Sequence, residues 1–478
     1  MALSEESIQA LVWEITQAPL GDGRLTQRVG RMMEQLARGP DQSLPQALED
    51  PSALEAAYRF LNNTNVTPEG LMTPHIEGTR LRAEQAGAVV VAHDTTEFRF
   101  GGEQRRQAIG RGRGKGAGFY GHFALCLSGQ ERHEPLGVIG LSLNHRAMQK
   151  KPKQTHAQRR DDPSNEARRW EHLCREVHER LGRALPCVHV MDREGDAYPL
   201  LQALSSQKIS FVVRVCHDRR VKSKENSEGM LLEAICAQAP VLAKREIQVS
   251  ARKRHAIPRV RTIHPPREGR MATLTLRSQR VQVPKPKGYT KGQGPEILSL
   301  HVVFVEEEHP PSPTEKVSWW LWTSEPVDTE EQVLRVVDLY RARWKIEEYF
   351  HALKTGCAYE TRQLESRHAL VNILCLFIPI AWKLFQLKSL CQSNPDQPAE
   401  TVVDEESVEI LRQLRCIRTK GPPTVTEVFA AIARLGGHRP QNGPPGWLVL
   451  TRGYQKLLML KHGAFLYKTL TSQKEKDV

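Results

Sequence analysis

The sequence predicts an α/β protein, and three observations lead to that prediction. Apolar runs of strand length occur at 88–96, 118–128, 134–144, 185–192 and 209–215. Amphipathic helical segments separate the later runs, at 164–182 and 196–207. Two of the apolar runs, AVVVAHD and LPCVHVMD, stop at an aspartate, Asp94 and Asp192. Buried strands that end in this way deliver a carboxylate to the rim of a sheet.

Residues 1–70 are expected to form a small helical domain. Ser4 followed by acidic residues is a helix start, and further helices are predicted in GRLTQRVGRMMEQLAR and LEDPSALEAAYRFLNN. The helix in GRLTQRVGRMMEQLAR carries Arg24, Arg28 and Arg31. Arg24 and Arg31 are seven residues apart and share a face, and Arg28 is within about one turn of both. An arginine face on a three-helix unit suits contact with DNA, although a solvated helix surface explains the same pattern.

The catalytic core is expected at 71–390 and a helical C-terminal domain at 391–478. Alternating apolar and polar residues, broken by Pro/Gly-rich turns, predict an inserted antiparallel β region at about 217–316. The alternating strand SWWLWT follows, and its tryptophans are either core residues or a surface on which a DNA base stacks. Near the C-terminus, 447–470 is a helix whose wide apolar face serves packing or self-association.

The segment 333–356 is predicted to be one continuous helix, because it lacks Pro and Gly until its last residue. At about 100° per residue, Tyr340, Arg343, Glu347 and Lys354 share one polar stripe. A carboxylate among phosphate-binding donors suits a metal ligand that acts on a charged backbone. Together with the aspartates at the two strand ends, this glutamate would make an oxygen site for Mg²⁺ or Mn²⁺.

Charge and cysteine content narrow the function classes. The chain of 478 residues carries a formal net charge of +13, which favours a polyanion partner such as nucleic acid. Nine cysteines occur without a CxxC pair or a Cys/His spacing typical of zinc, so reduced thiols in a cytoplasm are expected. The apolar run 369–385 is interrupted by polar residues and by a proline, so we expect a buried helix and no membrane segment.

In this order, HDTT, MDREGD and YRARWKIEEYFHALKTG resemble the bacterial cut-and-paste transposases of the IS-four family. The family signature is Tyr, two residues, Arg, three residues, Glu, six residues and Lys. Tyr340, Arg343, Glu347 and Lys354 fit it without a gap. In the first domain, GDGRLTQR and AAYRFLNNTNV are similar to the part of these proteins that binds the transposon end.

The resemblance implies a ribonuclease-H-like catalytic core whose carboxylates hold two Mg²⁺ ions, with Mn²⁺ as a substitute. The expected catalytic and metal-binding residues are Asp94, Asp192 and Glu347, with Asp94 bridging both ions. The expected DNA-binding residues are Tyr340, Arg343, Lys354, Trp319, Arg214, Arg24 and Arg28. Among them Trp319 would stack on a flipped base, a choice that the residues alone do not make over Trp320.

The implied reaction is metal-dependent cleavage of double-stranded DNA at terminal inverted repeats, through a hairpin, followed by strand transfer into target DNA. The resemblance also implies a homodimer in the synaptic complex. Two other functions remain open. One is a ribonuclease-H-like nuclease without transposition, and the other is a DNA-binding repressor that has lost catalysis. The acids just behind Asp192 are expected to be structural, with Glu194 pairing locally and Asp196 capping the next helix.

Overall fold

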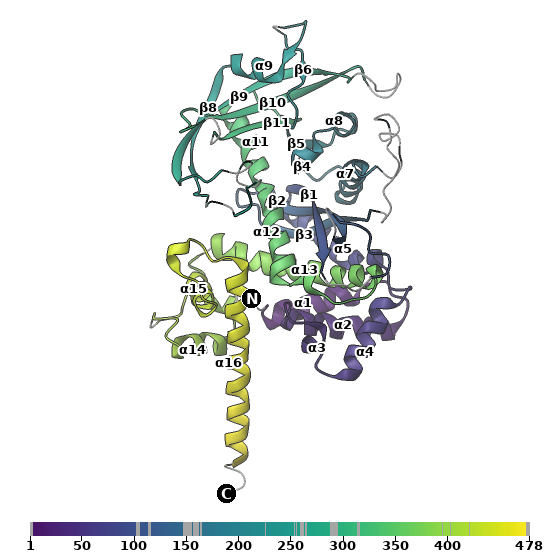
Figure 1. Ribbon diagram of the computed structural model, residues 1–478, viewed down its shortest axis with the longest axis vertical. Helices are drawn as coiled ribbons and strands as arrows, with labels where there is room; N and C mark the ends of the chain where they lie inside the picture. The colour runs from purple at the N-terminus through teal and green to yellow at the C-terminus, as the bar shows by residue number, and fades with distance from the viewer. Residues whose placement is uncertain are drawn as a thin grey trace. The chain divides into compact units, whose positions relative to one another are not determined.

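The computed structural model describes residues 3–474, apart from gaps at 102–105, 113–115, 147–154, 156–161, 163–164, 225, 253, 255, 259–261, 263–264, 287–294, 313–315, 394, 402 and 420. The chain forms two compact units. Unit 1 comprises Met1–Gly87, Thr95–Lys151 and Lys345–Val478, and unit 2 comprises Ala88–Asp94 and Pro152–Trp344. The mixed α/β fold is confirmed, with helices and one large mixed sheet (Figure 1).

Unit 1 begins with a group of helices whose ends follow local sequence signals. They are α1 (Glu5–Thr16), α2 (Gly23–Arg38), α3 (Leu44–Ala47), α4 (Pro51–Asn62) and α5 (Pro68–Ala86). The side chains of Ser4, Asp22 and Asp50 cap α1, α2 and α4 by accepting hydrogen bonds from backbone N–H groups. The helices expected within residues 1–70 are therefore present, and a short helix, α3, is added to them.

The strands of unit 1 are the second part of β1 (Val89–Phe100), β2 (Ala117–Ser128) and β3 (Pro135–Asn144). They lie in the order β3-β2-β1, with β2 and β3 antiparallel. Helix α13 (Arg367–Ser393) packs against β3, α4 and α5. Among the described residues it is the one helix long and apolar enough to cross a membrane, yet 83% of its apolar window is buried inside the protein, as the sequence analysis expected.

The remaining elements of unit 1 are all helical. They are α12 (Trp344–His351), η3 (Ala352–Gly356), η4 (Tyr359–Thr361), η5 (Ala399–Thr401), α14 (Glu405–Gln413), α15 (Val425–Leu435), η6 (Pro440–Asn442) and α16 (Trp447–Lys474). Helix α16 packs on α14, α15 and η3.

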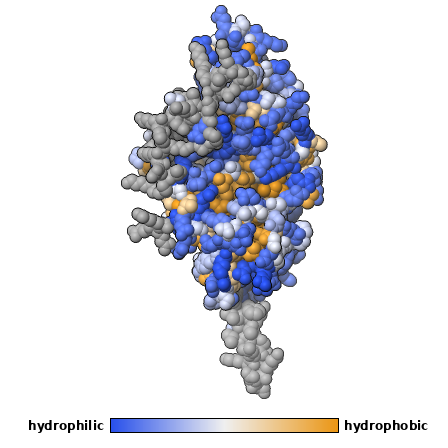
Figure 2. Space-filling view, turned by 90° about the vertical axis from the view of Figure 1, so that its right-hand side faces the viewer, coloured by the Kyte–Doolittle hydropathy of each residue, from blue (hydrophilic) through white to orange (hydrophobic). Residues whose placement is uncertain are grey.

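Hydrophilic residues cover much of the face shown in Figure 2, and hydrophobic ones gather near its middle.

The sheet of unit 2 runs β1-β4-β5-β11-β10-β9-β8. Its strands after β1 are β4 (Cys187–Met191), β5 (Ser210–Arg214), β8 (Val241–Val249), β9 (Arg270–Pro284), β10 (Ile297–Glu307) and β11 (Ser318–Thr323). The pairs β1–β4 and β4–β5 are parallel, and all pairs from β5 to β8 are antiparallel. A separate ribbon pairs β6 (Arg220–Val221) with β7 (Met230–Leu231).

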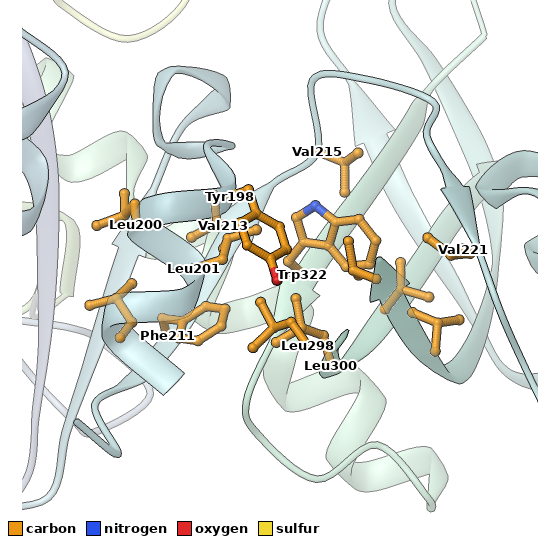
Figure 3. Packing of buried hydrophobic residues seen from close by; sticks show 14 of the residues in the cluster. Tyr198, Leu200, Leu201, Phe211, Val213, Val215, Val221, Leu298, Leu300 and Trp322 are labelled. Atoms are coloured by element: carbon orange, nitrogen blue, oxygen red, sulfur yellow. The ribbon is translucent and has the colours of Figure 1, made fainter. Parts of the chain in front are cut away.

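Helices cover both faces of this sheet. On one face lie α7 (Arg168–Leu181), η1 (Arg193–Gly195), α8 (Tyr198–Ser206) and α9 (Leu232–Gln238). Their core includes Met191, Phe211, Val213 and Trp322, and Figure 3 shows Tyr198 and Trp322 among the residues of this cluster. Because strand residues alternate between faces, the intervening residues point the other way. There α11 (Glu330–Ala342) packs against β4, β5, β8, β9 and β10 (Figure 1).

The order of elements along the chain agrees with the expected core: three strands, a helix, a parallel strand, a helix and a parallel strand. The antiparallel β region at 217–316 is also present, but it includes helix α9. Its long strands extend the main sheet, because β11 pairs with β5 on one side and β10 on the other. The division into three consecutive domains stays a prediction.

Candidate active site

The register of two parallel strands places Asp94 and Asp192 next to each other. His93 is the partner of Met191 in the β1–β4 pairing, and each aspartate is the next residue along the chain. Asp192 directly follows β4, whereas β1 continues past Asp94 to Phe100, which corrects the expectation that this strand stops at its aspartate. Adjacent strands lie about 4.8 Å apart, so the two backbones present their carboxylates from neighbouring positions. Asp192 also begins the turn η1, where its Oδ1 accepts a hydrogen bond of 2.9 Å from the N–H of Glu194.

Asp94 forms an ion pair with the residue that ends α11. Nη1 of Arg343 lies 3.1 Å from Oδ2 of Asp94. The arginine is buried, with 5% of its surface exposed, whereas the Asp94 side chain is 19% exposed. This contact is possible because Asp94 follows His93 on the strand and therefore points to the opposite face, on which α11 lies. Unit 2 thus brings two predicted site residues, Asp94 and Arg343, into direct contact.

The helix that carries the signature is not continuous, which corrects the sequence expectation. Helix α11 ends at Ala342, Arg343 is its C-cap residue, and α12 begins at Trp344. The last turn, η3, is a π-helix. A π-helical turn holds more residues than an α-helical one, so angles counted at 100° per residue do not apply to Lys354.

Tyr340 and Trp319 contact each other in unit 2. Their ring centroids are 5.9 Å apart in an edge-to-face arrangement. Tyr340 is 1% exposed, so its ring is part of the core and not of an exposed polar stripe. Trp319 is half-buried, whereas Trp322 is fully buried, which makes Trp319 the more accessible of these two indoles. The structure also leaves Trp320 half-buried, with its ring 5.5 Å from that of Phe304.

Arg214 ends β5 and stands opposite Leu321 in the pairing with β11. Its Nη2 donates a hydrogen bond of 3.4 Å to the carbonyl oxygen of Ser318. Because Met191 pairs with Val213 in the β4–β5 register, Arg214 lies next to Asp192. The Arg214 side chain is half-buried. This position agrees with a basic residue near the carboxylates of Asp94 and Asp192.

Asp196 has a structural role different from the predicted helix cap. Its side chain is fully buried and accepts four hydrogen bonds, from the N–H groups of Cys216 and His217, from Arg219 and from the indole of Trp322. Helix α8 begins after Ala197 without a side-chain cap. The carboxylate therefore ties the chain after β5 to β11. The alternation in SWWLWT was compatible with core tryptophans, but nothing in that segment indicated that Trp322 pairs with Asp196.

Glu194 pairs with Arg169 at 3.0 Å, and this corrects the expectation of a local pair because the arginine lies on α7. The Glu194 side chain is 45% exposed. An exposed pair of this kind contributes about 0–1 kcal/mol. Glu194 thus differs sharply from Asp196, although the two acids are separated by a single residue.

Within unit 1, Glu347 lies in the first turn of α12 and is half-buried. Its neighbour Glu348 points away to α13, where Oε2 accepts a hydrogen bond from Lys388. Lys354, in η3, donates to the carbonyl oxygen of Glu97 and lies 3.6 Å from the carboxylate of Glu360. Burial lowers the pKa of the Lys354 ammonium, and the negative charge of Glu360 opposes that shift.

The arginines of α2 divide into exposed and engaged residues. Arg24 and Arg31 are exposed, as a DNA-binding face requires. Arg28 is half-buried, and its Nη1 donates 3.1 Å to the carbonyl oxygen of Ala56 on α4. Arg28 therefore also holds two helices of the predicted DNA-binding domain together.

The donor set of unit 2 fits a hard divalent cation. Two carboxylates at adjacent positions of neighbouring strands provide the oxygen ligands that Mg²⁺ and Mn²⁺ prefer, and both are half-buried, so an ion can reach them. The nearby Arg343 offers a planar, permanently charged donor suited to a phosphate.

Comparison with known proteins assigns two parts of the chain. Residues 9–66 match the family described as transposase DNA-binding, and residues 148–378 match the transposase DDE domain. The second match includes Asp192 and Glu347 and begins after Asp94. Among solved structures, the chain is similar to piggyBac transposase in a synaptic complex with hairpin DNA, with 11% identity and a TM-score of 0.30. That similarity covers 72% of this chain and 59% of the other, less than two thirds of its length.

The two family matches together place a transposase DNA-binding region near the N-terminus and a transposase DDE domain in the middle of the chain. The second match is to the domain that carries the carboxylates of such transposases, and it spans a little under half of the chain. DDE domains generally use divalent metal ions, in agreement with the donor set of unit 2.

Proposed function

We propose that this protein is a DNA transposase, an enzyme that cleaves DNA and transfers its strands, and that it moves DNA by a cut-and-paste reaction in the manner of the IS-four family, with particular resemblance to Tn-five transposase. The observation that carries the proposal is the β1–β4 register, which sets Asp94 beside Asp192. Arg343 forms an ion pair with Asp94 at this position. The signature Tyr340, Arg343, Glu347 and Lys354 adds the third acid, one helical turn of sequence after the arginine.

Asp94, Asp192 and Glu347 would hold two Mg²⁺ ions, with Mn²⁺ as a substitute. When bound, a pair of such ions supplies Lewis-acid stabilisation of the attacking and leaving oxygens in an in-line displacement. The contribution of the chain itself is to supply three carboxylate ligands and to orient the phosphodiester. Arg343, which contacts Asp94, would place a positive charge beside these carboxylates, where the scissile phosphate would bind.

The DNA contacts follow from the position of each predicted residue. Arg343, Lys354 and Arg214 would contact phosphates near the cleaved bond, and the Tyr340 ring supports Trp319 from the core. An indole presented to DNA can stack on an extruded base, which stabilises a strained hairpin. In the N-terminal domain, Arg24 and Arg28 would contact the terminal inverted repeat, and the exposed position of Arg24 supports the first of these.

The proposed sequence of reactions begins with attack of water on the phosphodiester at the transposon end, which frees a 3′-OH. That 3′-OH attacks the opposite strand and releases the flanking DNA, so that the transposon end closes as a hairpin. A second water opens the hairpin, and the restored 3′-OH joins target DNA. We propose that a homodimer carries out these steps in the bacterial cytoplasm, at the nucleoid.

Cleavage of end DNA tests the catalytic assignment. The purified chain is incubated with Mg²⁺ and with the inverted repeats that flank its coding region. The wild type should yield nicked, hairpin and joined products in that order. Asp94→Ala, Asp192→Ala and Glu347→Ala should lose at least about 10³-fold in cleavage rate, because each removes a charged ligand at the reacting centre. Glu194→Gln is the matched control, since it alters an exposed acid of the same loop.

The products distinguish the competing functions. Open ends without hairpins would reject the hairpin step, and cut ends without joined products would favour a plain nuclease. If the wild type and Asp94→Ala bind end DNA equally and neither cuts it, the chain is a binding protein. Sedimentation of the complex with paired ends tests the homodimer, which a single protein copy per pair of ends would contradict.

A further inference from the structure

Two histidines and a cysteine meet inside unit 2, on the face of the sheet opposite Asp94. They are His93 on β1, His189 on β4 and Cys174 on α7, and all three are buried. Nε2 of His93 lies 2.8 Å from Nδ1 of His189 and 3.7 Å from Sγ of Cys174. One ligand atom from each residue falls within 4.8 Å of the others.

The fold brings these residues together through strand register and helix periodicity. His189 pairs with Val91, two residues before His93, so the two histidines are diagonal neighbours on one face of parallel strands. Cys174 lies on the buried face of α7, one turn after Trp170. No Cys/His spacing in the sequence reveals this group, because its members come from three separate elements.

We propose that His93, Cys174 and His189 bind a single d¹⁰ cation, Zn²⁺ or Cu⁺. Imidazole and thiolate are the ligands that these ions prefer, whereas Mg²⁺ and Mn²⁺ prefer oxygen. Bond lengths of about 2.0–2.1 Å to nitrogen and 2.3 Å to sulfur place tetrahedral N and S ligands about 3.6 Å apart. The distance of 3.7 Å between His93 and Cys174 already matches that spacing. The two ring nitrogens at 2.8 Å need to separate by roughly half an ångström.

The surroundings suit such an ion. Sγ of Cys187 lies 3.5 Å from Nε2 of His189, a contact that orients the imidazole with Nδ1 toward the group. Burial lowers the pKa of His189 well below its ordinary value, so the ring stays neutral and keeps a lone pair for the ion. Burial raises the pKa of the Cys174 thiol, so the incoming cation must displace its proton to solvent.

The alternative to an ion is a histidine pair joined by an ordinary hydrogen bond in the core. That alternative accounts for the contact between the two rings and leaves the approach of Cys174 as simple packing. The two explanations differ in a measurable way, because only a cation site binds metal in a fixed ratio and depends on Cys174. The proposal does not rest on catalysis, since the carboxylates on the opposite face form a site of different chemistry.

Metal titration of the full chain decides between them. The protein is prepared without an affinity tag in an Asp192→Asn background, which weakens the oxygen site, and is stripped with a chelator. Zn²⁺ is titrated in competition with a chromophoric chelator, Cu⁺ with a Cu⁺-specific chelator under reducing conditions, and Co²⁺ serves as a spectroscopic probe. We expect one equivalent of Zn²⁺ or of Cu⁺ per chain and a thiolate-to-cobalt charge-transfer band.

Three variants assign the site. Cys174→Ala should abolish the cobalt band and weaken binding at least about 100-fold, whereas Cys236→Ala, which alters a buried cysteine elsewhere in unit 2, should leave both unchanged. Cys187→Ala keeps all three ligands and should weaken binding about 10–100-fold, which keeps the test decisive if Cys174→Ala fails to fold. The proposal is overturned if neither Zn²⁺ nor Cu⁺ binds in a stoichiometric ratio. It is also overturned if Cys174→Ala binds the ion as tightly as the wild type.

Discussion

Replacement of Asp196 by alanine should destabilise unit 2 far more than any other change of an acid near the candidate site. The Asp196 carboxylate is completely buried, and Oδ1 lies 2.7 Å from Nη2 of Arg219 and 3.0 Å from Nε1 of Trp322. Its Oδ2 accepts from the N–H of Cys216 at 2.7 Å. Alanine removes the only negative charge in this group and leaves these donors without that acceptor.

The size of the effect follows from these contacts. Removal of one partner of a buried ion pair costs about 3–5 kcal/mol, and each buried donor left unsatisfied costs about 1–3 kcal/mol. The Arg219 side chain is 19% exposed, so water compensates part of its charge. We therefore expect a loss of about 4 kcal/mol, which is below a simple sum because the donors share one acceptor. The total stability of a domain is about 5–15 kcal/mol, so the unit should remain folded but open more often.

Native-state hydrogen exchange read by mass spectrometry measures this loss in the elements concerned. Peptides from β5 and β11 should exchange roughly 1,000-fold faster in Asp196→Ala, since each 1.4 kcal/mol corresponds to a factor of ten. Glu194→Ala is the matched control, because its pair with Arg169 is exposed and is worth about 0–1 kcal/mol. Equal exchange in the two variants would refute the reasoning, as it would show that the Asp196 network carries no net stability.

Three further predictions concern DNA. Trp319→Ala should lower hairpin yield by about 5–150-fold, from the 1–3 kcal/mol of a base stack, whereas Trp320→Phe should not. Arg24→Ala should reduce the salt dependence of end binding by about one unit of slope, while Arg28→Ala should chiefly lower the melting temperature, because Arg28 also holds α4. Lys354 has a pKa below its ordinary 10.5 through burial. End binding measured without metal should therefore weaken as pH rises through a value below 10.5, and Lys354→Arg should remove this dependence.

Each of these predictions has an outcome that contradicts it. Equal hairpin yields for Trp319→Ala and Trp320→Phe would mean that the extruded DNA base does not stack on Trp319 in preference to Trp320. An unchanged salt slope in Arg24→Ala would mean that this arginine does not neutralise a phosphate. The lowered pKa of Lys354 also has a stability consequence: the charged ammonium is disfavoured in the fold, so the free energy of unfolding should increase as pH rises above the folded pKa. Lys354→Arg should lack that increase.

Local features of the sequence predicted the mixed α/β class, the helices of the first 70 residues and the two strands that bring in Asp94 and Asp192, but not that β1 continues past Asp94 to Phe100. Such features depend on periodicity and on hydrogen bonds between close neighbours. Ser4 and Asp22, for example, accept from N–H groups two or three residues away, within a window that the sequence displays directly. The signature residues could be recognised for the same reason, because their spacing is a property of one short segment.

The tertiary structure decided which of these residues meet. Asp196 was expected to act locally, but its partners lie 20 to 126 residues away, and their positions depend on the pairing of β5 with β11. The break at Arg343 likewise accompanies an ion pair with Asp94 across 249 residues. His93, Cys174 and His189 had no visible relation in the sequence, because strand register and helix packing bring them together. Contacts between distant residues depend on the free energy of the whole packed unit, which no short window of sequence contains.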